Sequence, residues 1–298
     1  MKKRDTFSSI HPAIEMFYFA WVLVITMLMT HPAVLITTLI STSVYAVYLK
    51  GGRALKFELI CVLPLMLLTA AMNPLFNHAG VTTLFYLSNG NPITLEAVLY
   101  GLAAAAMFGG IMVCFSCYNH IVTSDKLMYV FGRIIPSLSL LISMALRFVP
   151  RFSGHIKDVS NSQKNIGMSV ETGSIIKRLR SGLSILSATV TWALENAVIT
   201  ADSMKSRGYG LKGRTAFSIF KFYKRDKIVL ITLAALAIVF ALCIFTGQIY
   251  IRYYPSVRIN GHSISAIAGY VSFAVFCNLP MILNVSEDIK WRRSESKI

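Results

Sequence analysis

Six runs of apolar residues, each close to the length that a bilayer requires, constrain this chain more than any other feature. A helix needs about 20 consecutive apolar residues to cross the hydrocarbon core of a membrane. The runs extend over 14–30, 32–49, 59–72, 95–118, 228–246 and 263–284. The third run is short and contains Pro64, so its limits are less well defined than the others. The pattern predicts an all-α integral membrane protein with about six transmembrane helices.

The composition supports the same class. Apolar residues make up 55% of the 298 residues and charged residues only 14%, which is far from the average of soluble proteins. The first run has no small-residue cleavage site, so we interpret it as an uncleaved span rather than a signal peptide. A net charge of +16 could suit a nucleic-acid partner, but no nucleic-acid recognition motif is visible. We expect no nucleic-acid partner, and anionic lipid headgroups beside the basic residues.

The lysines and arginines predict an orientation, because loops on the cytoplasmic side retain most basic residues. With the amino terminus inside, 27 of the 29 fall in cytoplasmic segments, and only Arg252 and Arg258 fall outside. The loop 73–94 has none, whereas the region between the fourth and fifth runs has 17. We expect a multi-pass protein of the cell membrane with both termini in the cytoplasm.

This topology predicts three parts. Residues 1–119 would contain transmembrane helices 1 to 4, and 120–227 a basic cytoplasmic helical region. Residues 228–298 would contain the last two transmembrane helices and a cytoplasmic tail.

The cytoplasmic region contains two long amphipathic segments. Apolar residues recur in both at steps of three and four, which is the pattern of one helix face. Pro150 should kink the first of the two helices. The first stripe comprises Leu138, Leu141, Ala145, Val149, Phe152, Ile156 and Val159, and the second comprises Ile176, Leu179, Leu183, Leu186, Val190, Ala193, Ala197, Ala201 and Met204.

Both segments end in the frame Lys-x-x-Gly. It occurs at Lys164 to Gly167, the first tail, and 41 residues later at Lys205 to Gly208, the second tail. Glycine here supplies a left-handed C-terminal cap, and lysine in the last turn suits the negative end of the helix dipole. Two capped surface helices would explain each frame separately, but a simple membrane scaffold does not explain the repetition.

Local patterns predict details of the spans. Gly101, Ala105 and Gly109 have the small-xxx-small spacing that lets another helix approach closely. Asn73-Pro74 should end the third span, and Thr94 should be the N-cap of the fourth.

Patterns that carry chemistry are missing from the sequence. It contains no phosphate-binding GxxxxGK[ST] loop, no Gly-x-Ser-x-Gly elbow and no acidic cluster. Cys114-x-x-Cys117 has the spacing of a redox or metal pair, but it falls in a span without a second pair, so we interpret it as buried thiols. We expect a non-enzymatic protein with no catalytic residue, cofactor or metal site.

Charged residues are also missing from the centres of the spans. Glu15, Glu58 and Glu96 lie near span ends. Ion-coupled transporters usually need ionisable groups at mid-membrane depth. A self-contained secondary permease therefore fits less well, although it is the main alternative function. An intramembrane enzyme would need a catalytic cluster.

The sequence resembles the transmembrane T component of energy-coupling factor (ECF) transporters, the CbiQ/EcfT-like relatives of ABC importers, over nearly its whole length. The motif Ser206-Arg207-Gly208, the segment Ala145-Leu146-Arg147-Phe148-Val149-Pro150 and the Asn73-Pro74 loop carry the resemblance. In that family, arginine-glycine motifs end two cytoplasmic coupling helices. The first motif, Asn165-Ile166-Gly167, departs from the family pattern because Ile166 replaces the usual arginine.

The resemblance implies a non-catalytic subunit that contacts three partners. Two cytoplasmic ABC-type ATPases would bind the coupling helices, and a separate membrane S component would capture a vitamin or metal ion. Ser206, Arg207 and Gly208, with Asn165, Ile166 and Gly167, would then make the ATPase contacts. The apolar stripes would pack against a partner or against each other.

Overall fold

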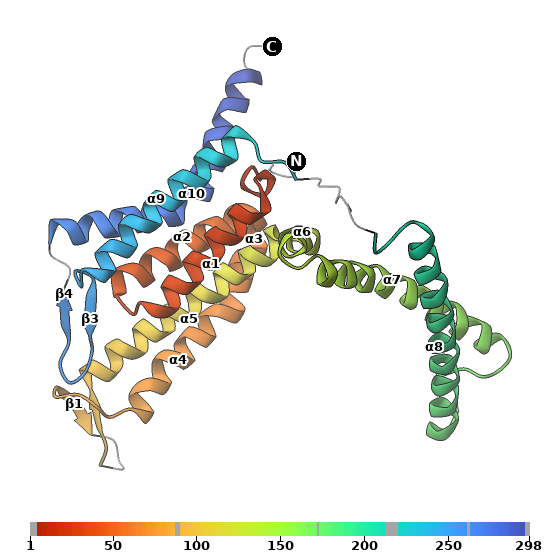
Figure 1. Cartoon of the computed structure of the whole chain (residues 1–298). Helices are drawn as coiled ribbons and strands as arrows, with labels where there is room; N and C mark the ends of the chain where they lie inside the picture. Colours follow the sequence, from red (N-terminus) through yellow and green to blue (C-terminus); the bar gives the residue numbers. More distant parts are fainter. Residues whose placement is uncertain (1–4, 87–89, 172, 212–219, 261–262, 296–298) are drawn as a thin grey trace. The chain divides into compact units, whose positions relative to one another are not determined.

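The structure is a computed structural model that describes residues 5–86, 90–171, 173–211, 220–260 and 263–295. The chain forms two compact units (Figure 1). The bundle unit comprises Met1–Leu127 and Phe220–Ile298, and the inserted unit comprises Met128–Ile219. The inserted unit lies within the basic region predicted at 120–227.

Helices make up most of the described bundle unit, and two of them begin at a proline. Pro12 and Pro32 occupy first-turn positions, where a missing amide hydrogen costs nothing. His31 caps its helix by accepting a hydrogen bond from the Ala33 amide at 3.3 Å, and burial lowers the pKa of His31, which favours the neutral, accepting form. The helices are η1 Phe7–Ser9, α1 Pro12–Leu28, α2 Pro32–Lys50, α3 Gly52–Phe57, η2 Glu58–Val62, α4 Leu63–Phe76, α5 Leu95–Ile121, the start of α6 (Ser124–Ile134), α9 Lys224–Phe245 and α10 Ile264–Glu295.

The core of the bundle unit forms where α5 packs against α1, α2 and α4, and where α10 packs against α2 and α9. The largest fully buried side chains are aromatic: Phe7, Phe19, Phe240, Phe273 and Phe276. Many aliphatic side chains of the same helices face outward. Exposed apolar helix faces are expected where lipid replaces water as the solvent.

Six described helices are long and apolar enough to cross a membrane. Five of them, α2, Gly52–Phe76, α5, α9 and α10, coincide with predicted spans. The predicted first span corresponds to α1, which is shorter at 17 residues. The sixth candidate is α8, Ile175–Ser206, which has the lowest hydropathy of the six and which the charge pattern assigns to the cytoplasm.

The third span is longer than predicted. A π-helical turn at Glu58–Val62 joins α3 to α4, and the Leu63 amide donates to the carbonyl of Glu58. This wider turn carries the helix past Pro64. The expectation that Asn73-Pro74 ends the span was wrong, because α4 continues through Pro74 to Phe76.

Packing against α5 explains why Pro74 does not end α4. Proline removes the amide that would bond the carbonyl of Ala70, four residues earlier. Gly101 of α5 lies against that carbonyl, so closely that a Cβ there would lie 2.7 Å from the oxygen. The Asn73 side chain also donates to the carbonyl of Ala97 at 2.6 Å. The predicted close helix approach at Gly101 is confirmed.

Two antiparallel hairpins lie at one end of the bundle unit (Figure 1). β1 (Thr83–Tyr86) pairs with β2 (Pro92–Thr94), and β3 (Tyr250–Arg252) pairs with β4 (Arg258–Asn260). Both hairpins belong to loops that the charge pattern predicts to lie outside the cell. Thr94 then caps α5, since its hydroxyl accepts from the Ala97 amide at 3.3 Å, as predicted.

The inserted unit consists of most of α6 (Ser124–Ile134), α7 (Pro136–Asn165) and α8. α7 is one helix that includes Pro150. Trp192 of α8 stacks on His155 with ring centroids 4.2 Å apart and meets Phe152 edge-on at 5.7 Å. Further along, the Gln163 amide donates to the Ser184 hydroxyl at 2.8 Å. The order of these contacts requires α7 and α8 to run in opposite directions.

Candidate functional site

The first tail ends α7 with a regular cap. Gly167 turns the chain with a φ of +79°. Its amide donates to the carbonyl of Lys164 at 3.1 Å, and the Met168 amide donates to that of Gln163 at 2.9 Å. Together the two bonds form a Schellman cap, which satisfies carbonyl groups that the end of a helix leaves free.

The second tail ends α8 with the same cap. Gly208 has a φ of +78°. Its amide donates to the carbonyl of Lys205 at 3.0 Å, and the Tyr209 amide donates to that of Met204 at 3.0 Å. The predicted left-handed glycine is therefore confirmed in both tails, and each lysine lies in the last helical turn as expected.

Ile166 and Arg207 occupy equivalent positions between the last helical residue and the glycine. Their φ and ψ angles are −95° and 14° for Ile166, and −84° and 9° for Arg207. Ile166 is 72% exposed, and Arg207 is exposed as well. Asn165 and Ser206, one position earlier, are also exposed. Each tail therefore presents its motif at an accessible tip.

The two tails lie far apart on the helix pair. The first tail lies beside Arg180 of α8, because Gly167 and Arg180 line the same hollow. Arg180 and Arg207 are separated by 27 positions of one chain. At a rise of 1.5 Å per residue this separation amounts to roughly 40 Å. The two tips are therefore separate surfaces of the inserted unit.

The hollow beside the first tail is a feature that sequence reasoning missed. It has a volume of about 240 Å³. Two cationic side chains, Lys177 and Arg180, reach it from the first turns of α8, and Ser181 at its wall is 5% exposed. Positive charge thus lies beside Gly167, the residue that follows Ile166. The lining residues are Gly167, Met168, Ser169, Lys177, Arg180 and Ser181.

Two polar contacts hold the loop that follows the first tail. Arg178 donates through Nε to the carbonyl of Val170 at 2.7 Å. Lys164 pairs with Glu171 at 3.0 Å, and both side chains are exposed. The arginine contact fixes the loop against α8, whereas an exposed pair of this kind contributes little stability.

The predicted apolar stripe of α8 remains largely exposed. Leu179, Leu183 and Leu186 are 57 to 63% exposed. The buried side of α8 is formed instead by Ser181, Ile185 and Thr189. An aliphatic stripe left uncovered along a helix of this length marks an interaction surface.

The Cys114-x-x-Cys117 pair of the bundle unit forms no disulfide. Cys114 and Cys117 are buried free thiols, as predicted. Among the residues that the structure describes, no three His, Cys, Asp or Glu side chains come together in a way that could hold a metal ion.

The fold defines the class of protein first: a multi-pass membrane protein with an inserted, amphipathic helical unit. Comparison with known families then supplies the identity. The pattern of the CbiQ family, described as cobalt transport protein, matches residues 5–219, which is more than half of the chain. The chain belongs to this family.

Several curated relatives share one description, energy-coupling factor transporter transmembrane protein EcfT. The relative from Leuconostoc gelidum subsp. gasicomitatum is 34% identical over 107 residues, which cover 36% of this chain and 40% of the relative. The relative from Lactobacillus helveticus is 34% identical over 110 residues, with the same coverage of both chains. A longer match, to EcfT 1 of Listeria monocytogenes, is 25% identical over 195 residues, or 61% of this chain and 69% of the relative. The first two matches thus span about 40% of the relatives' length.

Proposed function

We propose that this protein is the energy-coupling transmembrane component of an ECF-type importer. In this function it transmits the ATP-driven motion of two cytoplasmic ATPases to a membrane S component. The S component binds a vitamin or a metal ion and determines which substrate is imported. The chain itself does not hydrolyse ATP, in keeping with the missing phosphate-binding loop in its sequence.

The observation that carries this proposal is the pair of equivalent tails. Ser206-Arg207-Gly208 and Asn165-Ile166-Gly167 present their central residues on matching caps, roughly 40 Å apart by the helix rise. A repeated contact at two distant tips suits two similar subunits. The guanidinium of Arg207 keeps its charge and can make two parallel hydrogen bonds to a carboxylate of one ATPase.

The first tail binds its ATPase by different chemistry. Ile166 offers an aliphatic surface of the kind that packs into an apolar recess of a partner. Lys177 and Arg180 in the adjacent hollow add positive charge for an acidic side chain of the same partner. The exposed stripe on α8 provides further apolar area between the two tips.

Co-purification tests the function directly. The chain is expressed with two candidate ABC ATPases and an S component, and the isolated complex is assayed for ATP hydrolysis and for uptake in proteoliposomes. We expect a complex that contains both ATPases and takes up substrate only with ATP. The chain purified alone should not hydrolyse ATP. Failure to bind either ATPase, or uptake by the chain alone, would favour the self-contained permease instead.

The orientation has its own test. Single cysteines near Ser88 and Lys164, introduced into a chain without its five native cysteines, are treated in intact cells with a membrane-impermeant thiol reagent. The positive-inside rule predicts labelling near Ser88 and protection near Lys164. The reverse pattern would overturn the placement of both termini and of residues 157–212 in the cytoplasm.

A further inference from the structure

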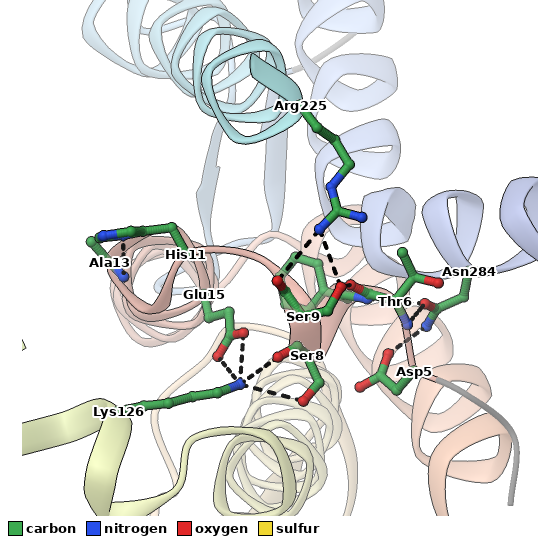
Figure 2. A network of polar contacts seen from close by, with 11 residues as sticks. Asp5, Thr6, Ser8, Ser9, His11, Ala13, Glu15, Lys126, Arg225 and Asn284 are labelled. Atoms are coloured by element: carbon green, nitrogen blue, oxygen red, sulfur yellow. Dashed lines mark hydrogen bonds and ion pairs between the residues drawn. The ribbon is translucent and has the colours of Figure 1, made fainter. Parts of the chain in front are cut away.

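A short segment at the start of the bundle unit contacts both connections between the two units. We call residues 5–15 the clasp. It contains η1 and the first turn of α1. All of its contacts described below lie within the bundle unit. Figure 2 shows its polar contacts with Lys126, Arg225 and Asn284.

The clasp is fixed to the bundle by its backbone and by one aromatic ring. Asn284 of α10, which is fully buried, accepts hydrogen bonds from the amides of Thr6 at 2.8 Å and Phe7 at 3.1 Å. The same side chain donates to Asp5 at 2.8 Å. The Phe7 ring is 0% exposed and lies edge-on to Tyr18 at 5.4 Å. The clasp is thus part of the core.

Lys126 binds the clasp where the chain leaves the bundle unit. Its ammonium group lies 2.8 and 2.9 Å from the two carboxylate oxygens of Glu15. It also donates to the carbonyl of Ser8 at 2.7 Å and contacts the Ser8 hydroxyl at 3.3 Å. The Glu15 side chain is completely buried and that of Lys126 is 9% exposed. The inserted unit begins two residues later, at Met128.

Arg225 binds the clasp where the chain returns to the bundle unit. Its guanidinium donates to the hydroxyl of Ser9 at 3.1 Å and to the Ser9 carbonyl at 3.4 Å. It also lies 3.6 Å from Glu287 of α10. Nearby, Phe222 meets the ring of His11 with centroids 4.5 Å apart. Adjacent serines, Ser8 and Ser9, therefore each hold one of the two connections.

Stability alone does not account for the Lys126–Glu15 pair. The free energy needed to remove two charges from water is about as large as the attraction between them. Proteins in which apolar residues replace such a pair are therefore often equally stable. What a saturated pair does provide is a fixed geometry, since the ammonium here is bonded to both Glu15 oxygens and to Ser8. Any displacement of the start of α6 must move the clasp or break these bonds.

We propose that the clasp is the mechanical joint through which movement of the inserted unit is transmitted to the transmembrane helices. Lys126 and Arg225 transfer displacements of the two connections to Ser8 and Ser9. Glu15 and Asn284 pass them to α1 and α10. The inference rests on the proposed energy-coupling function and assigns positioning roles to Glu15, Lys126 and Arg225.

The test compares variants in the complete complex in proteoliposomes. The double variant Glu15→Gln with Lys126→Met removes the pair without leaving a buried charge. We expect normal assembly with both ATPases and normal ATP hydrolysis, but about fivefold or greater loss of substrate imported per ATP, the lower range of a typical coupling energy. Arg225→Gln should also lower the amount of substrate imported per ATP, but by a smaller factor, because the Arg225 side chain is 41% exposed.

Lys50→Met is the matched control. Lys50 also binds the carbonyl and hydroxyl of a serine, Ser116, at 2.7 and 2.6 Å, but it joins two helices inside the bundle. Its import per ATP should stay close to wild type. An unchanged ratio in the double variant, or an equal loss in Lys50→Met, would overturn the joint.

Two further outcomes are also decisive. If the double variant does not assemble with the ATPases, the test rests on Arg225→Gln alone. Wild-type import of substrate per ATP in Arg225→Gln then rejects the proposal. If the wild-type chain itself does not bind ATPases, the proposed function fails, which is a result distinct from failure of the joint.

Discussion

Ile166 and Arg207 compare directly, because two caps of almost the same backbone geometry present them at equivalent positions. The matching glycine φ angles and hydrogen bonds fix where each tip lies. The side chains then differ: one tip is aliphatic with cations in the hollow beside it, and the other carries its own guanidinium. The position of each exposed side chain and its chemistry are therefore set separately, the first by the cap and the second by one residue.

Arg207→Ala should have the largest effect. Truncating one partner of an interfacial charge pair costs about 2 to 5 kcal/mol, much of it from the stranded partner charge. We expect weaker binding of one ATPase or hydrolysis without uptake. Co-purification and transport measure both outcomes, with Lys205→Ala in the same tail as the control. Equal losses for the two variants would mean that Arg207 has no special contact.

Ile166→Ala should cost less. Truncating an aliphatic side chain that an ATPase would bury costs about 1 to 3 kcal/mol of binding free energy, and it leaves no stranded charge. The other ATPase should therefore be retained more fully than in Arg207→Ala. A defect in Ile166→Ala as severe as that of Arg207→Ala would contradict the difference between the tails.

Arg180→Ala examines whether the hollow compensates for the missing arginine. An exposed charge pair is worth about 1 kcal/mol or less, and salt screens it. We therefore expect a small loss of ATPase binding that becomes smaller still at high ionic strength. Lys157→Ala, on exposed α7 surface outside the hollow, is the control. A loss that matches Arg207→Ala would show that both tails rely on charge.

The glycines should give the smallest difference between the tails. Alanine at Gly167 or Gly208 would be held in the left-handed region, which costs about 1 to 2 kcal/mol in each case. A Cβ at Gly208 would also lie 3.1 Å from the side chain of Leu211. A Cβ at Gly167 would have no neighbouring atom within 4 Å. Gly208→Ala should therefore lower the thermal stability of the purified chain slightly more. Gly182→Ala inside α8 should not lower it, and equal losses at all three sites would argue against the caps.

The sequence predicted features that depend on local chemistry. Spans follow from long apolar runs, and both caps follow from a glycine and a lysine within one turn. The passage of α4 through Pro74 was not predicted, because neighbouring α5 stabilises a conformation that proline alone disfavours. The π-turn at Glu58–Val62 was not predicted either, because no residue pattern in the sequence marks it.

Contacts between residues that are far apart in the chain could not be predicted from the sequence. Glu15 was recognised near a span end, but its partner Lys126 lies 111 residues away. Likewise, periodicity identified an apolar stripe on α8, yet it could not tell that Ser181, Ile185 and Thr189 would be the buried side. Which side of an amphipathic helix is covered depends on the neighbours that the chain supplies.

The short α1 has a consequence for the surrounding lipid. Its 17 residues extend about 26 Å, whereas the 27 residues of α5 extend about 40 Å. A hydrocarbon core of ~30 Å is shorter than α5 and longer than α1. If both helices span it, α5 would tilt or extend into the headgroup region, and the bilayer would thin beside α1. The protein would then be surrounded by a membrane of uneven thickness, thinner on the side of α1.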